Sequence, residues 1–227
     1  MSQTQLPPWL SVLAVVAHPD DESFALGAIL AAFAEAGARV SVLCLTRGEA
    51  STLHGVAGDL TELRAEELAA AAAALGLDDV TLMTYPDGRL PAVDLDVLAA
   101  HVVTTARDVE ADGIIGFDLT GVTGHPDHAH ATAAAIRAAE DLALPVLGWT
   151  VPDTVAATLR DEHGAPFDGY HESEIDLVVT VDRSLQSKAV GCHSSQAVPG
   201  SVMWRRIELL GDHEHLRWLR RAQASQP

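Results

Sequence analysis

The sequence has little of what defines several classes of protein. Cysteine occurs twice, at Cys44 and Cys192. Two cysteines so far apart predict a reduced, cytoplasmic chain and no disulfide scaffold. Basic residues number 14 against 32 acidic ones, which gives a net charge of −18. Such a field repels nucleic acid and anionic membranes, and no basic stripe occurs, so neither is expected as a partner.

Other absences narrow the possibilities further. No apolar run is both long enough and free enough of charge to cross a bilayer, so no stable membrane insertion is expected. Residues 1–9 lack the basic region of a signal peptide. Aromatic residues make up only 4% of the chain. The tryptophans are interpreted as core or interface anchors, and Trp149 is the best candidate for a sugar platform because a predicted strand ends nearby.

The chain does have a regular alternation of strand-like and helix-like segments. Strands are predicted at 10–16, 40–45, 80–84, 114–117, 146–151 and 175–181, and helices at 22–36, 60–75, 95–109, 127–142, 184–195 and 208–221. Repeated strand–helix units imply right-handed crossovers and a mainly parallel sheet. We therefore predict an α/β, three-layer Rossmann-like fold with helices on both faces. Residues 152–173 are expected to be irregular, and 47–59 to form a lid-like loop.

The segment Ala17-His18-Pro19-Asp20-Asp21-Glu22 directly follows the first predicted strand. Open α/β sheets bind their ligands at this end of their strands. His18 and Asp21 offer an imidazole nitrogen and a carboxylate oxygen, both normal zinc ligands. Asp20 is then a second carboxylate that is free to act on a proton. The alternative is a simple helix start, in which acids suit the first turn and Asp21 is the N-cap.

A second segment, Gly124-His125-Pro126-Asp127-His128, follows the apolar run 113–117 and again opens a helix. His128 supplies a third metal ligand from the first helical turn. Two histidines and one aspartate, with a fourth position left for water, are typical of a catalytic zinc site. Asp127 is expected to fix the tautomer of His125 and to keep that ring protonated. A capped helix with surface histidines is the alternative, but two such motifs at strand ends support each other.

Together the two motifs closely resemble those of the PIG-L/LmbE-like zinc deacetylases. This family includes N-acetylglucosaminyl-phosphatidylinositol de-N-acetylase and the deacetylases of mycothiol and bacillithiol synthesis. Weaker features, among them Thr46-Arg47-Gly48-Glu49 and His193-Ser194-Ser195-Gln196, fall in the expected order. The resemblance covers about residues 10–196, which implies a single domain at 1–227 with a C-terminal extension at about 197–227.

The resemblance implies a zinc-dependent hydrolase that removes the acetyl group from an N-acetylglucosamine-type amino sugar derivative. The implied metal ligands are His18, Asp21 and His128, and the implied catalytic residues are Asp20, His125 and Asp127. Asp20 is expected to be the general base, with electrostatic support of the metal as its alternative role. Protonated His125, oriented by Asp127, is expected to stabilise the oxyanion. Zn²⁺ is the expected metal, with Fe²⁺ or another divalent ion as the alternative on the same ligands.

Four further residues are expected to bind substrate: Arg47, Arg64, Asp87 and His193. Each has a plainer interpretation, because the arginines suit a solvated surface, Asp87 suits a turn, and His193 suits helix packing. The alternative function is that of a zinc amidase cleaving a larger amide such as a thiol conjugate. A small-molecule substrate is the expected partner, and the resemblance is also compatible with a homo-oligomer.

Overall fold

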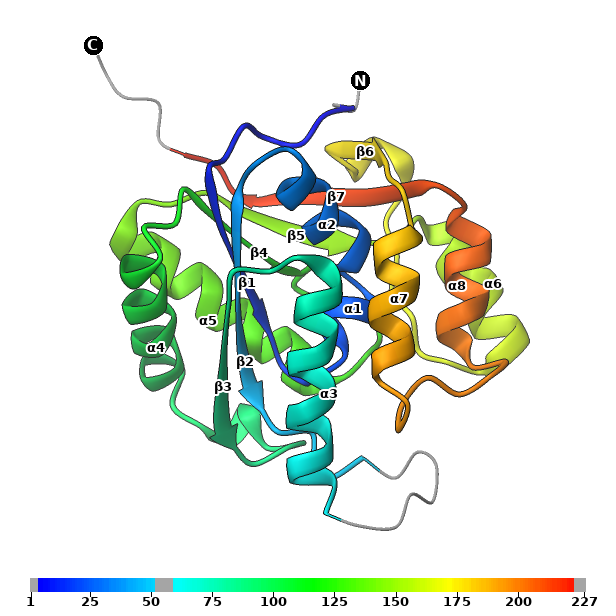
Figure 1. Cartoon of the computed structure of the whole chain (residues 1–227). Helices are drawn as coiled ribbons and strands as arrows, with labels where there is room; N and C mark the ends of the chain where they lie inside the picture. The colour runs from blue at the N-terminus through cyan, green and yellow to red at the C-terminus, as the bar shows by residue number, and fades with distance from the viewer. Residues whose placement is uncertain (1–3, 52–58, 223–227) are drawn as a thin grey trace.

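The computed structural model describes residues 4–51 and 59–222, and in that part of the chain it contains one seven-stranded sheet (Figure 1). The strand order is β3-β2-β1-β4-β5-β7-β6. Strands β1 to β5 run parallel, whereas β7 is antiparallel to both β5 and β6. The strands are β1 (Ser11–Val16), β2 (Arg39–Thr46), β3 (Asp79–Tyr85), β4 (Gly113–Phe117), β5 (Val146–Thr150), β6 (Leu177–Thr180) and β7 (His213–Arg220).

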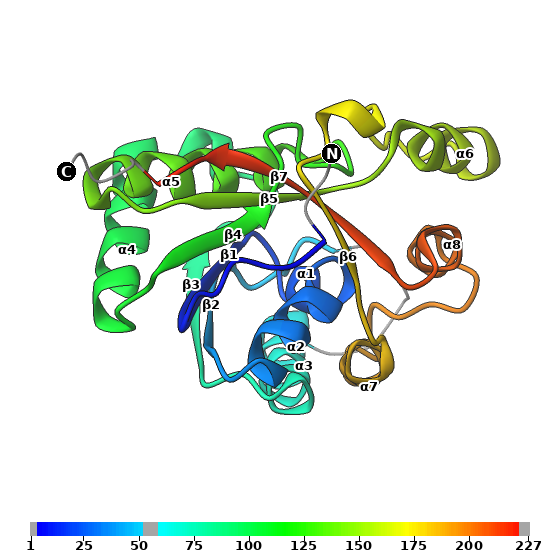
Figure 2. The same cartoon turned by 90° about the horizontal axis from the view of Figure 1, so that it is seen from above.

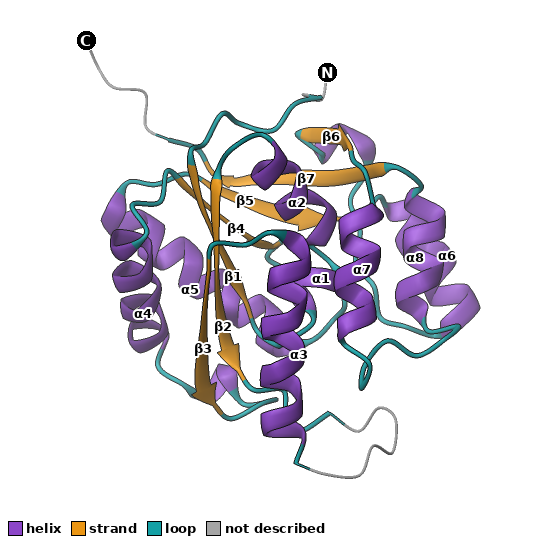
Figure 3. Ribbon diagram, in the orientation of Figure 1, coloured by secondary structure: helices purple, strands orange, loops and turns teal. Residues whose placement is uncertain are grey.

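Helices cover both faces of this sheet (Figures 2 and 3). One face carries α4 (Leu95–Asp108) and α5 (Pro126–Leu142), and the other carries α1 (Asp21–Phe24), α2 (Gly27–Glu35), α3 (Leu60–Leu75) and α7 (Ser184–Cys192). Helices α6 (Asp153–His163) and α8 (Val202–Leu210) pack against each other. Short 3₁₀ turns lie at η1 (Leu90–Ala92) and η2 (Glu172–Glu174). The predicted three-layer fold with a mainly parallel sheet is confirmed.

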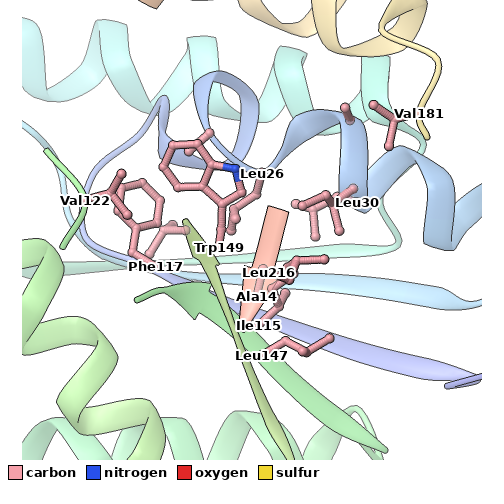
Figure 4. Packing of buried hydrophobic residues seen from close by; sticks show 14 of the residues in the cluster. Ala14, Leu26, Leu30, Ile115, Phe117, Val122, Leu147, Trp149, Val181 and Leu216 are labelled. Atoms are coloured by element: carbon pink, nitrogen blue, oxygen red, sulfur yellow. The ribbon is translucent and has the colours of Figure 1, made fainter. Parts of the chain in front are cut away.

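Strand β1 lies at the centre, and all six of its residues are buried. Because side chains alternate along a strand, β1 contributes to two cores. Val12 and Ala14 pack into the cluster on the α2 side, and Leu13 and Val15 pack into the cluster with α4 and α5. Figure 4 shows part of the first cluster, where Trp149 lies beside Phe117. Burial on both faces explains why this strand reads as a continuous apolar run.

The topology also locates a binding crevice. The chain leaves β1 toward β2 and β3 on one side, and later returns to add β4 and β5 on the other side. Ligands of open α/β sheets bind outside the carboxyl ends of the strands where the strand order reverses in this way. Both sequence motifs emerge at this point, because one follows β1 and the other follows β4.

The helix predicted at 22–36 is broken in two. Helix α1 ends at Phe24 and α2 begins at Gly27. The side chain of Gln186 explains the break, since its Nε2 donates to the carbonyl oxygens of Ser23 and Phe24 at 3.0 and 3.3 Å. Those carbonyls therefore have partners outside the helix, and the chain can turn between its two halves.

The prediction of an irregular segment at 152–173 is wrong in its first half, which forms α6. Ala156 and Leu159 are fully buried on one face of this helix. Gly164 ends the helix in the left-handed conformation with a φ of 64°. The turn-forming residues that indicated an irregular segment thus lie at and beyond the end of the helix.

The helix predicted at 208–221 is also wrong. Helix α8 ends at Leu210, and β7 follows from His213. Gly211, with a φ of 60°, separates the two elements. Glu214 and Leu216 are buried, whereas His215 and Arg217 are partly exposed, and this period of two is typical of a strand. The last part of the chain therefore places β7 between β5 and β6.

Two expectations concern membranes and the loop beside the site. Within residues 4–51 and 59–222, none of the helices combines the length and the apolar character that crossing a bilayer requires. The lid-like loop predicted at 47–59 lies largely outside the described residues, which stop at Ser51 and resume at Asp59. It therefore stays a prediction.

Candidate active site

The end of β1 holds the first motif in a fixed backbone arrangement. The Oδ2 atom of Asp21 accepts hydrogen bonds from the backbone N–H groups of Ala17 and His18, at 3.2 and 2.9 Å. Asp21 and His18 are each 7% exposed. These bonds orient the Asp21 carboxylate, so that it lies beside the imidazole of His18 and not over the start of α1.

Helix α5 brings His128 to the same place. Nε2 of His128 lies 3.2 Å from Oδ1 of Asp21 and 3.2 Å from Nδ1 of His18. Nδ1 of His18 is 3.6 Å from Oδ2 of Asp21. With zinc bonds of about 2.0–2.2 Å, neighbouring ligand atoms of a tetrahedral site lie about 3.3–3.6 Å apart. The spacing and the donor chemistry of these residues therefore fit a divalent metal.

The second ring nitrogen of His128, Nδ1, also has partners that orient the ring. Its Nδ1 lies 2.9 Å from Oγ1 of Thr123 and 3.2 Å from the carbonyl oxygen of Gly121. A carbonyl partner selects the tautomer with hydrogen on Nδ1, which leaves the Nε2 lone pair free for a metal.

The second nitrogen of His18 faces two further carboxylates. Its Nε2 lies 3.0 Å from Oδ1 of Asp87 and 3.4 Å from Oδ2 of Asp127. Burial opposes the charged ring, but the neighbouring carboxylates of Asp127, Asp21 and Asp87 raise the pKa of His18 well above its ordinary value. Carboxylates behind a histidine ligand fix its ring and strengthen it as a donor.

Among the described residues, two sets of donor atoms lie within 4.8 Å of one another: His18, His125 and His128, and His18, Asp87 and Asp127. His18 belongs to both sets and also lies beside Asp21.

The position of Asp127 differs from the expected one. Its carboxylate accepts hydrogen bonds from the backbone N–H groups of Gly88 and Leu90, at 2.8 and 3.1 Å, and approaches His18. Its contact with His125 is through the backbone, because the N–H of Asp127 donates to Nδ1 of His125 at 3.2 Å. The prediction that the Asp127 carboxylate orients His125 is therefore not what the structure shows. The side chain supports His18 and the turn before η1 instead.

The hydrogen bond from the Asp127 N–H to Nδ1 of His125 determines which ring nitrogen of neutral His125 carries the hydrogen. A ring nitrogen that accepts an N–H bond carries no hydrogen, so neutral His125 has its hydrogen on Nε2. Burial and the neighbouring rings of His18 and His128 lower the pKa of His125. A neutral ring that donates through Nε2 fits this geometry better than the protonated ring expected from the sequence.

Asp20 is held in a strained conformation beside the metal-ligand candidates. Its φ is 128°, which is rare for any residue except glycine. Its backbone N–H donates to Oε2 of Glu22 at 2.9 Å, and its Oδ2 lies 2.9 Å from Nη2 of Arg64. Burial raises the pKa of Asp20 to about 6 although Arg64 opposes this shift. Such strained, perturbed carboxylates are typical of catalytic sites.

These residues open onto a cavity of about 580 Å³. From the two motifs, its lining contains His18, Asp20, Asp21, His125 and His128. Apolar and aromatic residues complete it, among them Phe24, Phe117, Trp149, Phe167 and Met203. A cavity of this size accepts a molecule much larger than an acetyl group. Trp149, the tryptophan selected from the sequence, does line it.

The motifs, their positions and the cavity agree with the comparison against protein families. The model of the PIG-L family, described as GlcNAc-PI de-N-acetylase, matches residues 13–139, more than half of the chain. The chain belongs to the PIG-L family. The family expected from the sequence is thus confirmed.

The curated relatives that match this chain are named as deacetylases. The PIG-L chain is 36% identical to a 1D-myo-inositol 2-acetamido-2-deoxy-alpha-D-glucopyranoside deacetylase of Acidothermus cellulolyticus, over 84% of this chain and 81% of that protein. It is also 36% identical to deacetylase 1 of that name from Catenulispora acidiphila, over 69% of this chain and 53% of the relative. The PIG-L chain therefore spans only about half the length of some of the curated relatives it matches.

Solved structures share the fold. The teicoplanin deacetylase Orf2, in its zinc-inhibited form, superposes with a TM-score of 0.69 at 21% identity, over 94% of this chain and all of that one. The 4-carboxy-2-hydroxymuconate hydratase GalB of Pseudomonas putida gives 0.69 at 20% identity, over 96% and 99%. Because a hydratase and a deacetylase share this fold, the reaction of the PIG-L chain has to be argued from its site.

Two of the residues expected to bind substrate line the cavity. Arg64 is 2% exposed and donates to the carbonyl oxygens of Pro19 and Gly48 as well as pairing with Asp20. Most of its donors are thus used to hold the loop and Asp20. Asp87 accepts a hydrogen bond from the N–H of Ala50 at 2.9 Å and faces His18.

The other two lie outside the lining of the cavity. Arg47 pairs with Glu62 at 3.0 Å on the surface. His193 is completely buried, and its Nε2 lies 2.7 Å from Oε1 of Glu22. Glu22 in turn accepts a hydrogen bond from the backbone N–H of Asp20. His193 therefore holds Glu22, which holds the backbone of Asp20, and is not placed to contact a sugar directly.

Sequence reasoning missed a network of polar side chains that reaches the cavity through Gln196. Glu67 accepts hydrogen bonds from Ser194 and from both the N–H and the hydroxyl of Ser195. Ser195 accepts from Gln196 Nε2 at 3.1 Å, and Gln196 Oε1 accepts from Ser51 at 2.9 Å. Gln196 lines the cavity. The run His193-Ser194-Ser195-Gln196 was the available signal, although only its histidine was selected.

Replacing Gly48 by alanine is expected to lower kcat by about 10- to 100-fold, because small displacements of positioning groups carry penalties of that size. A Cβ atom at Gly48 would lie 2.0 Å from Nη1 of Arg64 and would push the guanidinium away from Asp20. Gly164→Ala is the matched control, since the φ of Gly164, 64°, is within about one degree of the 65° of Gly48, and nothing lies within 4 Å of its Cβ. Steady-state kinetics of both variants test this, and equal kcat values would contradict it.

Proposed function

We propose that this protein is a metal-dependent amide hydrolase that removes the acetyl group from an N-acetylglucosamine-type amino sugar derivative. The observation that carries the proposal is the approach of Nε2 of His128 to 3.2 Å from both Oδ1 of Asp21 and Nδ1 of His18, beside Asp20. The names of the relatives, which describe deacetylation of a 2-acetamido-2-deoxy-glucopyranoside, support the same substrate class.

His18, Asp21 and His128 would hold the metal, which we propose to be Zn²⁺, with Fe²⁺ or another divalent ion as the alternative. When bound there, it would supply Lewis acidity to the amide carbonyl and lower the pKa of water. The contacts of His18 with Asp87 and Asp127, and of His128 with Thr123 and Gly121, would keep both rings in the ligand orientation.

The remaining roles belong to side chains of the cavity. Asp20, fixed by Glu22 and Arg64, takes the proton from the attacking water. Neutral His125 donates its Nε2–H to the oxyanion that develops at the amide carbon. The leaving amine needs one proton, which Asp20 returns, because it took that proton from the water in the first step and neutral His125 has none to give without becoming an anion. Both residues line the cavity that would receive the amide.

Cleavage of a larger amide, such as a thiol conjugate, is not favoured, because the relatives are named for deacetylation of an amino sugar. We also propose a cytoplasmic location, in keeping with two free cysteines, and a single domain at 1–227. Self-association of the chain stays a prediction.

Acetate release tests the proposal. The zinc-loaded protein is incubated with the glucosaminide of inositol in its N-acetylated form, with N,N'-diacetylchitobiose and with N-acetylglucosamine, and free acetate is measured. At least one compound is expected to release acetate in an equimolar ratio to free amine. If none of the three compounds releases acetate and the protein hydrolyses an amide that carries no acetyl group, the proposal is contradicted.

A further inference from the structure

Arg206, on α8, is a buried cation without an acidic partner. The residue is 2% exposed and belongs to the wall of the active-site cavity. Among residues 4–51 and 59–222, no carboxylate oxygen lies within 4.0 Å of its guanidinium, although other buried arginines such as Arg64 have one. In a chain with a net charge of −18, an arginine without an acid beside it calls for an explanation.

Some N–H donors of the Arg206 guanidinium have no acceptor among the described residues. Nη2 donates to the carbonyl oxygen of Phe24, and the planar group lies over the ring of Trp149, 4.8 Å from its centroid. Nη1 is buried and has no hydrogen-bond partner among the described residues. A buried N–H of a charged group that lacks an acceptor is rare in folded proteins, because its desolvation is not compensated.

Glu214, the acid whose charge acts on Arg206, is already paired with other groups. Glu214 is completely buried, and its Oε1 lies 2.5 Å from Nη1 of Arg183 while its Oε2 accepts from Nε1 of Trp149 at 2.8 Å. Arg183, Arg206 and Glu214 together therefore leave one positive charge in excess. Burial lowers the pKa of Arg206 to about 10, so the group is still protonated at neutral pH.

The surroundings of Arg206 strengthen its attraction for an anion. Phe24 and Trp149, which contact Arg206, line the cavity together with Val202 and Met203 of α8, so many of its neighbours are apolar. In such a medium of low dielectric constant, an unpaired charge is costly and a matching charge is strongly attracted. A guanidinium also presents paired N–H donors that match a carboxylate or a phosphate.

We propose that Arg206 binds an anionic group, a carboxylate or a phosphate, on the molecule that occupies the active-site cavity. The substrate is then an acidic amino sugar derivative, with its amide at His18 and His128 and its anion against α8. This extends the proposed deacetylase function by naming a charge on the substrate, and it rests on that function only for the identity of the scissile amide.

The test compares neutral and anionic amides. The zinc-loaded enzyme is assayed with N-acetylglucosamine, its 1-phosphate, its 6-phosphate and N-acetylmuramic acid, which carries a carboxylate. At least one anionic compound is expected to exceed the neutral sugar about tenfold or more in kcat/KM, as a desolvated charge pair allows. The phosphates and the carboxylate separate the two kinds of anion.

Variants of α8 assign the preference to one residue. In Arg206→Met the ratio of anionic to neutral kcat/KM is expected to fall toward one, and Arg206→Lys should keep part of it. The methionine variant should fold, because Arg183 and Glu214 remain paired and the Phe24 carbonyl still accepts from Gln186. Arg205→Gln is the control on the same helix, since Arg205 pairs with Glu162 and Glu208 at the surface and should leave the ratio as in the wild type.

Calorimetry separates this proposal from the proposed function. The same compounds are titrated into Asp20→Asn, with and without Arg206→Met, because Asp20→Asn is expected to turn substrate over too slowly to disturb the binding signal. Arg206-dependent binding of an anionic sugar without any acetate release by the wild type would support the anion site and refute the deacetylase. Equal binding and turnover of neutral and anionic sugars, or an anionic preference that survives in Arg206→Met, would overturn the assignment of Arg206.

Discussion

The Asp20→Asn variant is expected to lose about 10²- to 10⁴-fold in kcat, the usual contribution of a positioned general base. Asparagine has the same shape as aspartate but cannot take a proton. It also tolerates a positive φ as readily, so the 128° backbone of this position should persist. The substitution therefore removes the chemistry of Asp20 and leaves the neighbouring residues in place.

Three measurements make this prediction specific. Metal content should equal that of the wild type, because the ligands proposed are His18, Asp21 and His128. KM should change little, and the loss should lie in kcat. Asp161→Asn, at an exposed position of α6, is the matched control and should be as active as the wild type. Wild-type kcat in Asp20→Asn would show that another group is the base, and a loss of metal would place Asp20 among the ligands.

Removal of the metal is expected to have an effect of similar size. Treatment with a chelator should lower activity by about a thousandfold or more, since a bound metal contributes several kcal/mol of transition-state stabilisation. Added Zn²⁺ should restore activity to the chelated wild type. His128→Ala should be inactive and should not respond to added Zn²⁺, because it lacks the Nε2 atom that lies 3.2 Å from both His18 and Asp21.

Thermal unfolding gives a second readout for the same prediction. Zn²⁺ binds the folded site and should raise the Tm of the chelated wild type in proportion to the logarithm of its concentration. The Tm of His128→Ala should not respond. His163→Ala, at an exposed position near the end of α6, is the control and should respond as the wild type does. Full activity after exhaustive chelation would contradict a metal-dependent mechanism.

The sequence was sufficient for the parallel part of the sheet and for the place of the two motifs. Buried parallel strands produce continuous apolar runs, and their carboxyl ends meet at one edge of the sheet. The His18 and His128 motifs could therefore be brought together before any coordinates were known. The contacts that decide individual roles were out of reach, because chain position does not give the orientation of a side chain. Asp127 turned out to face His18, and His193 to face Glu22.

The C-terminal part shows a different limit. The sequence predicts one helix at 208–221, across Gly211, whereas the structure continues after Gly211 as a strand. Placing β7 inside the sheet brings α8 to the cavity, and with it Met203 and Arg206. Long-range strand pairing of this kind has no local sequence signal. A residue in a segment treated as an extension could not be recognised as part of the site.

The metal content of single variants tests the central claim most directly. Elemental analysis after zinc loading should give about one metal per chain for the wild type, as a single site with three protein ligands requires. It should give close to none for Asp21→Ala and His128→Ala, and about one for His125→Ala and Asp87→Asn. Loss of metal in His125→Ala or Asp87→Asn, with retention in Asp21→Ala, would contradict the ligand set and the mechanism built on it.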